Sequence, residues 1–388
     1  MRDKKKGAAG GWLCTGILFL MTFLMVKVEM GKGHEVLLYS DFATHSSWAV
    51  GEFTDPLYDK FYAYPVWHLM VRLANWLLPI GREYAGALVT ACCIGLGTLI
   101  LYHFLDKELN GSLSCKKICL LTMGIMVLTA LYMPWFNREV YLGQSSPTIW
   151  HNPTNMAVKP LALLLFLWFL RLYMNKQKIK GLEFAGFSGL LLLSCFVKPS
   201  FAQGFLPAVV LFLLIELVRT KGGSFFFSLK MAASFVPSGI YFLTQFFSMF
   251  GAQAERSMGI SPFTVMRFDT DHPLISILQA VAFPLFVVGI TGWKKLFGDR
   301  EFLFSLVFYV VSLLEFIVLI EITEPESGNF EWALQLAMFA FFAMAAVRFY
   351  QKEDKKLWMN YAGNGLLLYH VASGIYYYIY LLISPLQC

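Results

Sequence analysis

The residues with the clearest catalytic potential form a polar stripe that begins at residue 41. A helix starting near residue 40 would carry four of them on one face: Asp41, His45, Trp48 and Glu52. A carboxylate held beside a hydroxyl can remove its proton as the oxygen attacks, and a histidine one turn away could assist. We therefore predict that Asp41 and His45 are catalytic. The alternatives are that Asp41 only caps its helix and that His45 only orients its neighbours.

Basic residues near this stripe in the predicted layout are suited to hold a phosphate group. Arginine and lysine bind phosphate through charge-assisted hydrogen bonds, which strengthen where water is excluded. We predict a donor-phosphate site built from Arg138, Lys159, Lys198, Arg256 and Arg267. Lys159 and Lys198 each precede a proline at the end of an apolar run, so the alternative is that they extend along the membrane toward water. For Arg138 the alternative is a solvated ion pair with Glu139.

Other polar residues are predicted to contact the substrate: Glu52, His68, His151, Asn152 and His272. Segment 137–156 is rich in hydrogen-bonding side chains and contains two prolines, which favours a wet cavity over contact with lipid. A purely structural role in that loop is the alternative for His151. Glu315 lies within an apolar run, where a charge is costly, so we predict that it is paired or faces a cavity.

These polar residues are separated by apolar runs long enough to cross a membrane. Of the 388 residues, 57% are hydrophobic and 14% are charged. Runs of about 18–20 apolar residues suit the bilayer core, and in lipid they must be helices because every backbone group needs an internal partner. We predict an all-α polytopic membrane protein, with residues 1–388 forming a single transmembrane domain. About eleven spans are expected, at 10–28, 85–105, 118–136, 157–174, 183–197, 204–219, 228–247, 274–292, 302–321, 331–349 and 361–384.

The longest loop, 29–84, is expected to contain two juxtamembrane helices. The first carries the polar stripe described above. The second begins at Pro65, because proline suits the first turn of a helix. Its surface is apolar except for a narrow stripe made by His68, Arg72 and Asn75. That pattern is typical of a helix lying in the membrane interface.

The basic residues predict how the chain is oriented in the membrane. Most of the 31 Lys and Arg residues fall in loops that are cytoplasmic if the N-terminus is cytoplasmic. Segments 29–84, 137–156, 248–273 and 322–330 then lie outside. We expect a multi-pass protein of a cell membrane, the bacterial plasma membrane, with an extracytoplasmic active site. The net charge of +6 suits membrane lipid as a partner, and nothing indicates nucleic acid binding.

This layout resembles that of the GT-C superfamily of membrane-embedded glycosyltransferases. The shared features are one early span, a long outside loop with two juxtamembrane helices, and many further spans. Two short segments match locally: Ser40-Asp41-Phe42-Ala43-Thr44-His45 and Tyr64-Pro65-Val66-Trp67-His68. The resemblance implies a polyprenyl-phosphate- or pyrophosphate-linked sugar donor, a glycan or lipid acceptor, inverting transfer and a role in making envelope polysaccharide. It also implies an acidic catalytic residue in the first outside loop, which by position is Asp41.

Three other classes of function compete with this interpretation. A secondary transporter or lipid-linked-sugar flippase often has two similar halves, and this chain shows no such similarity. A membrane acyltransferase would centre on a histidine, for which His103 and His370 are available without a supporting motif. A scaffold subunit would need no chemistry. No cofactor and no protein-held metal site are expected, although a divalent cation such as Mg²⁺ or Mn²⁺ is compatible with the transfer.

The orientation can be tested by cysteine labelling. Single cysteines at Ser112 and Ser145, in a background without the seven natural cysteines, are expected to react from opposite sides of the membrane. Membrane-impermeant maleimide on intact cells should label position 145 and should reach position 112 only after permeabilisation. Labelling of both from one side would contradict the orientation.

Overall fold

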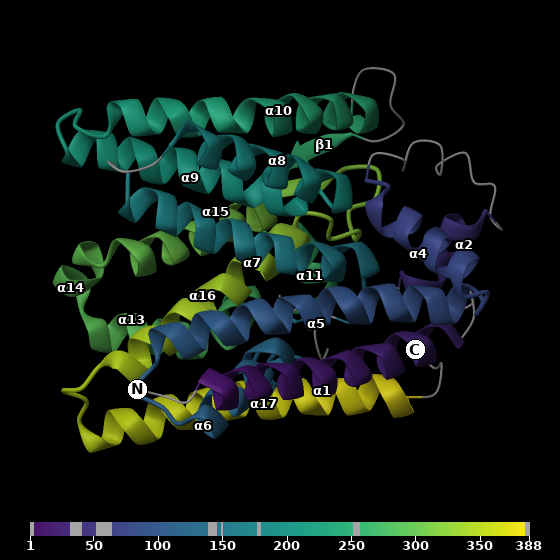
Figure 1. Ribbon diagram of the computed structural model, residues 1–388, viewed down its shortest axis with the longest axis horizontal. Helices are drawn as coiled ribbons and strands as arrows, with labels where there is room; N and C mark the ends of the chain where they lie inside the picture. The colour runs from purple at the N-terminus through teal and green to yellow at the C-terminus, as the bar shows by residue number, and fades with distance from the viewer. Residues whose placement is uncertain are drawn as a thin grey trace.

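The computed structural model describes residues 4–31, 41–51, 64–138, 146–148, 150–176, 180–250 and 257–384. Long helices run side by side along one direction to form an elongated bundle (Figure 1). The elements in chain order are α1 (Lys4–Gly31), α2 (Phe42–Val50), α4 (Val66–Leu77), α5 (Arg82–Glu108), α6 (Cys115–Val127), α7 (Pro153–Met174), α8 (Gly181–Val197), α9 (Ser200–Arg219), α10 (Phe225–Phe250), β1 (Met258–Ile260), α11 (Thr264–Asp269), α12 (Pro273–Ala280), α13 (Ala282–Thr291), α14 (Trp293–Gly298), α15 (Arg300–Val318), β2 (Leu319–Glu321), α16 (Glu331–Gln351) and α17 (Leu357–Ile383).

The helical, polytopic membrane architecture predicted from the apolar runs is confirmed. In the described part of the chain, eight helices are long and apolar enough to cross a membrane: α1, α5, α7, α9, α10, α15, α16 and α17. The other three predicted spans correspond to α6 with 13 residues, α8 with 17 residues, and the pair α12 and α13. These are short or broken, so the count of eleven stays a prediction.

Helix α16 forms the centre of the bundle. Every residue from Glu331 to Val347 is buried, and most of them are alanine, phenylalanine, methionine or leucine. A helix that is apolar on all faces can be surrounded by other helices, because it has no side that gains from contact with water. Helices α7, α9, α13 and α15 all contact it. The outer helices α1, α10 and α17 instead expose many large apolar side chains, as lipid contact requires.

Several loops that were predicted to be cytoplasmic lie at one end of the bundle. At the end we call the basic end, Arg348 is paired with Asp299 and Glu301, and the side chain of Gln351 donates to the backbone oxygen of Glu108. The opposite end, here called the site end, holds α2, α4 and β1 (Figure 1). The loops at Glu108, Asp299 and Gln351, all predicted to be cytoplasmic, therefore lie together, while which end faces the cytoplasm stays a prediction.

Two predicted spans are not continuous helices. The helix expected over 118–136 ends at Val127, and the one expected over 274–292 is bent by 70° at Val281, between α12 and α13. Pro284 lies in the first turn of α13, where its missing N–H leaves no hydrogen bond unmade. Hydropathy detects the apolar composition of such segments, but it does not detect where their backbone leaves the helical conformation.

Side chains from α17 satisfy the backbone at both interruptions. The Nδ1 of His370 donates to the backbone oxygen of Thr129 at 2.7 Å, and its Nε2 accepts from the Phe283 N–H at 3.3 Å. The hydroxyl of Ser373 accepts from the Tyr132 N–H at 3.0 Å. Irregular backbone is tolerated within a membrane only where protein supplies such partners. His370 is thus a neutral imidazole that joins the two interruptions.

Helix α17 reaches the end of α6 because residue 374 has no side chain. A Cβ atom on Gly374 would overlap the backbone oxygen of Val127, which cannot move aside as a flexible side chain could. The same helix contains Gly365, which is exposed. A Cβ atom added there would meet no other atom within 4 Å. These two glycines therefore form a matched pair for mutation.

Gly374→Ala is expected to lower the free energy of unfolding by about 1–3 kcal/mol, because α17 must move away from α6. Gly365→Ala should be neutral or stabilising by up to about 1 kcal/mol, since alanine favours a helix. The measurement is thermal unfolding of the purified protein in one detergent. Equal melting temperatures for the two variants would show that the close contact does not limit stability.

Candidate functional site

Asp41 lies where the start of α2 meets the loop before α7. Its Oδ2 accepts a hydrogen bond from Asn152 Nδ2 at 2.6 Å, and its Oδ1 lies 3.7 Å from His151 Nε2. Its backbone N–H donates to the backbone oxygen of His151 at 3.0 Å. Asp41 occupies the N-cap position of α2, yet its side chain makes no capping hydrogen bond. The helix-cap alternative for this carboxylate is therefore wrong.

Lys198 reaches the same place from the junction of α8 and α9. Its Nζ donates to Asn152 Oδ1 at 3.2 Å, so the amide of Asn152 bridges the ammonium group and the Asp41 carboxylate. Lys198 is buried, and its backbone is extended ahead of Pro199, as a residue preceding proline prefers. Burial lowers the pKa of Lys198 to about 8, although the nearby Asp41 carboxylate opposes this. The alternative that Lys198 extends toward water is wrong.

Asn152 is oriented by the start of α7. Its Oδ1 accepts from the Asn155 N–H at 2.9 Å and from the Thr154 hydroxyl at 2.7 Å, which makes it the N-cap of this helix. Pro153 at the first helical position suits that arrangement. The neighbouring His151 ring stacks on Trp332, with 5.8 Å between centroids. A rigid helix start thus fixes both residues that contact Asp41.

His45 pairs with His68 and not with the Asp41 side chain. The ring nitrogens His45 Nδ1 and His68 Nε2 lie 2.9 Å apart, which joins α2 to α4. Burial is the main cause that lowers the pKa of His68 to about 4 and holds that of His45 well below its ordinary value. Both rings are therefore neutral at pH 7, and this contact holds α2 against α4.

A cavity of about 420 Å³ adjoins the cluster. Lys198, Trp332 and Tyr64 line one part of it, and Lys198 Nζ lies 5.1 and 5.6 Å from the centroids of the two aromatic rings. The remaining wall comes from α9, α10, α15, the two strands and the segment between β2 and α16. It includes Gln203, Leu206, Phe242, Gln245, Phe246, Met258, Glu315, Leu319, Glu321, Asn329 and Phe330. The prediction that Glu315 is paired or faces a cavity is confirmed.

A short antiparallel ribbon, which the sequence did not suggest, forms part of the cavity wall. Strands β1 and β2 pair with Met258 opposite Glu321, and both of these residues line the cavity. Each strand has only three residues, too few for a recognisable alternating pattern. Trp332 was also not singled out from the sequence, because nothing there separates it from the other aromatic residues at span ends. Tyr64 was named only as the first residue of a matching segment and was not predicted to line the site.

The other predicted site residues lie elsewhere or outside the described residues. Lys159 is buried in α7, where its Nζ lies 4.3 Å from the ring centroid of Phe339 and 3.4 Å from the backbone oxygen of Pro147. Arg138, Arg267 and His272 are exposed, and within the described part of the chain no hydrogen bond or ion pair joins them to Asp41. Glu52 and Arg256 fall outside the described residues.

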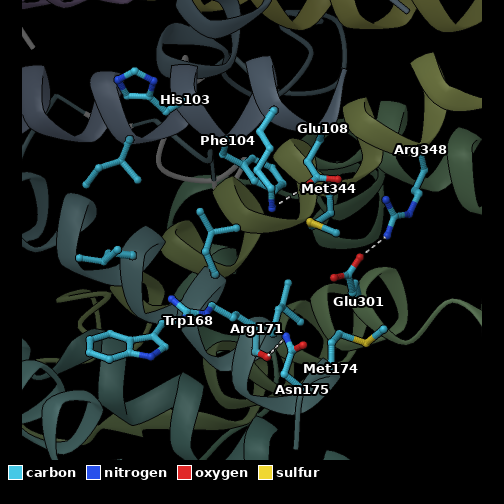
Figure 2. Close-up of a pocket in the computed structure, with 15 residues that line it drawn as sticks. His103, Phe104, Glu108, Trp168, Arg171, Met174, Asn175, Glu301, Met344 and Arg348 are labelled. Carbon is cyan, nitrogen blue, oxygen red and sulfur yellow. Dashed lines mark hydrogen bonds and ion pairs between the residues drawn. The ribbon is translucent and has the colours of Figure 1, made fainter. Parts of the chain in front are cut away.

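A larger cavity, of about 600 Å³, lies at the basic end between α5, α7 and α16 (Figure 2). Its three cations already have carboxylate partners: Arg348 with Glu301 at 2.7 Å, Lys107 with Glu108 at 3.3 Å, and Arg171 with Glu183 at 3.5 Å. Each cation lies in the last turn of its helix, where it balances the helix dipole. These charges have a structural explanation, so the chemistry is better sought at the site end.

Within the described ranges, no group of three or more His, Cys, Asp or Glu side chains is arranged to hold a metal ion. The chain matches no protein-family model, and no curated protein matches its sequence. Any function must therefore be argued from the site itself.

Proposed function

We propose that this protein is an integral membrane glycosyltransferase. It would transfer a sugar from a polyprenyl-phosphate- or pyrophosphate-linked donor to a glycan or lipid acceptor, at the end of the bundle that we take to be extracytoplasmic. One observation supports this more than any other: Lys198, which lines a cavity within a membrane protein, is joined to Asp41 through the amide of Asn152. A base and a phosphate-binding cation are the two groups that this transfer requires.

The proposed reaction assigns one role to each charged group. Asp41 removes the proton from an acceptor hydroxyl as its oxygen bonds to the anomeric carbon of the donor. The bond from that carbon to the phosphate oxygen breaks, and the phosphate leaves with the electron pair. Attack from the face opposite the leaving group inverts the anomeric centre. Lys198 stabilises the departing phosphate, and burial of this ammonium group makes the interaction stronger than in water.

The cavity wall suits a donor with a long apolar chain. Leu206, Phe242, Phe246 and Leu319 contribute apolar surface to it. The first three belong to membrane-crossing helices, α9 and α10, and Leu319 follows directly on α15. An isoprenoid chain could lie against this surface while its phosphate approaches Lys198. A soluble nucleotide-sugar donor would gain nothing from such a wall.

A secondary transporter is the second candidate, and the interrupted spans are the observation that favours it. Transporters use broken helices, whose unpaired backbone groups bind substrates and ions near the middle of the membrane. Here the backbone groups at the interruptions are already hydrogen-bonded to His370, to Ser373 and to the backbone oxygen of Gln279. The breaks therefore offer less to a transported ligand than the Asp41 cluster offers to a reacting one.

Asp41→Asn is expected to reduce sugar transfer by about 10²–10⁴-fold, because an amide keeps the shape of the carboxylate but cannot accept the proton. The assay follows release of polyprenyl phosphate or pyrophosphate from a lipid-linked sugar in liposomes, at equal concentrations of folded protein. Asp271→Asn serves as the control, because it changes an exposed carboxylate just before the start of α12, and it should keep normal activity. Turnover near the wild-type rate in Asp41→Asn would remove Asp41 from the mechanism.

The pH dependence of kcat/KM tests the role of Lys198. The pKa of this group in the free protein is about 8, so its positive charge is present below that pH and is lost above it. We expect kcat/KM for the donor to fall about tenfold for each pH unit above 8, because this ratio reports on the free enzyme. In Lys198→Arg the guanidinium stays charged, and the decline should disappear up to about pH 10. Identical profiles for the two proteins would exclude Lys198 as the group responsible.

A further inference from the structure

Glu315 is a carboxylate of the cavity that the proposed transfer does not use. It lies in α15, four residues before β2, and lines the cavity. Its Oε2 is shielded from solvent and makes no hydrogen bond, and the Gln203 side chain lies close to the carboxyl group. Within the described ranges no lysine or arginine forms an ion pair with Glu315. Carboxylates are rare in membrane spans because their desolvation is costly, and those that occur usually serve a ligand or a partner.

The surroundings of Glu315 favour a cation over a neutral ligand. Three phenylalanines line the part of the cavity outside the Lys198 group: Phe242, Phe246 and Phe330. The other two aromatic residues, Tyr64 and Trp332, lie beside Lys198. Aromatic faces attract cations, and they do so more strongly where water is excluded. A carboxylate among such residues resembles the sites that recognise ammonium groups. A hydroxyl group would bring only a hydrogen-bond donor to Oε2, whereas an ammonium group brings both a donor and the positive charge that stabilises the ionised carboxylate.

Lys198 supplies the complementary charge to a different part of the cavity. It is the one lysine or arginine among the described lining residues, and its ammonium group is held by Asn152 near Asp41. Glu315 is not among the charged groups that act on Lys198, whereas Asp41 is. The cavity thus has a cationic part suited to phosphate and a separate anionic part. A ligand that matches both carries a phosphate and an amine.

We propose that the cavity selects a substrate with a primary amine, and that Glu315 binds its ammonium group. In terms of the proposed function, on which this substrate assignment rests, the substrate class is an amino sugar. The amine belongs either to the transferred sugar or to the acceptor, and the recognition chemistry is the same for both. Glu315 is then a specificity-determining residue, since it contacts substrate without taking part in bond formation.

Binding of simple glycosides to the protein in lipid nanodiscs tests this assignment without any need for turnover. Three probes share one alkyl chain: octyl 2-amino-2-deoxyglucoside, octyl N-acetylglucosaminide and octyl glucoside. At pH 6.5, where the amine is protonated, we expect the amino glycoside to bind about tenfold or more tightly than the other two, as a buried charge-assisted hydrogen bond implies. Dissociation constants can be measured by quenching of tryptophan fluorescence.

In Glu315→Gln the preference for the amino glycoside should vanish, while the affinity for octyl glucoside stays the same. The amide has nearly the same shape and no charge to desolvate, so the variant should fold at least as well as the wild type. Glu183→Gln, at the basic end of α8, is the matched control and should retain the preference. Equal binding of all three probes to the wild type would overturn the proposal, as would a preference that survives in Glu315→Gln.

Transfer assays then separate this inference from the proposed function. The donors are lipid-linked glucosamine and lipid-linked glucose, and the acceptors are tested with and without an amine. The donor–acceptor pair that the wild type prefers shows whether the amine belongs to the donor sugar or to the acceptor. In Glu315→Gln the ratio of kcat/KM for the substrate with the amine to kcat/KM for the matching substrate without it should fall about tenfold or more. Absence of transfer from every donor would count against the glycosyltransferase, while the amine preference in binding would stand as an independent result.

Discussion

The need to pair every backbone polar group within an apolar bilayer shapes this structure more than any single contact. Most of the chain meets it with continuous helices. At residues 128–132 and at Val281 the helices stop inside the bundle, and the freed groups are satisfied by α17, by the Ser146 hydroxyl and by the backbone oxygen of Gln279. His370 does this for both interruptions at once, with one ring nitrogen donating and the other accepting. The close approach that makes this feasible depends on Gly374, so helix packing and backbone pairing are parts of one arrangement.

Buried charges are treated differently at the two ends of the bundle. At the basic end, Glu216 is fully buried and bonded to Arg219, Arg300 and Tyr173, so α7, α9 and α15 are held together by a charge network with every member paired. At the site end, Asp41 and Lys198 share only the amide of Asn152, and Glu315 has no cationic partner among the described residues. Pairing all groups stabilises a fold, whereas leaving charges incompletely paired keeps them available to a ligand.

The sequence predicted most of what depends on local composition. Apolar runs located the long helices, Pro65 marked the start of α4, and the cost of a charge in lipid pointed to Glu315. It did not reveal the interruptions, because hydropathy does not depend on backbone conformation. It also did not reveal the ribbon, because its strands have only three residues each. Asp41, His151, Asn152 and Lys198 were each selected, but their convergence is a tertiary property. The pairing of His45 with His68 was missed for that reason, since spacing within one helix does not show which neighbour packs against it.

The interruption at α6 has a consequence for the synthesis of this protein. A helix of 13 residues is about 20 Å long, shorter than the hydrocarbon core, and the segment after it cannot remain in lipid with bare peptide groups. Its partners in α17 follow it by more than 200 residues, so they leave the ribosome much later. Until then the segment must be held near the translocon or at the membrane surface, where water or another protein can solvate it. The bundle is therefore complete only after the C-terminal helix α17 has been inserted. Truncation before α17 would leave the other helices inserted but the segment after α6 unpaired, and such a chain would be open to quality-control proteases.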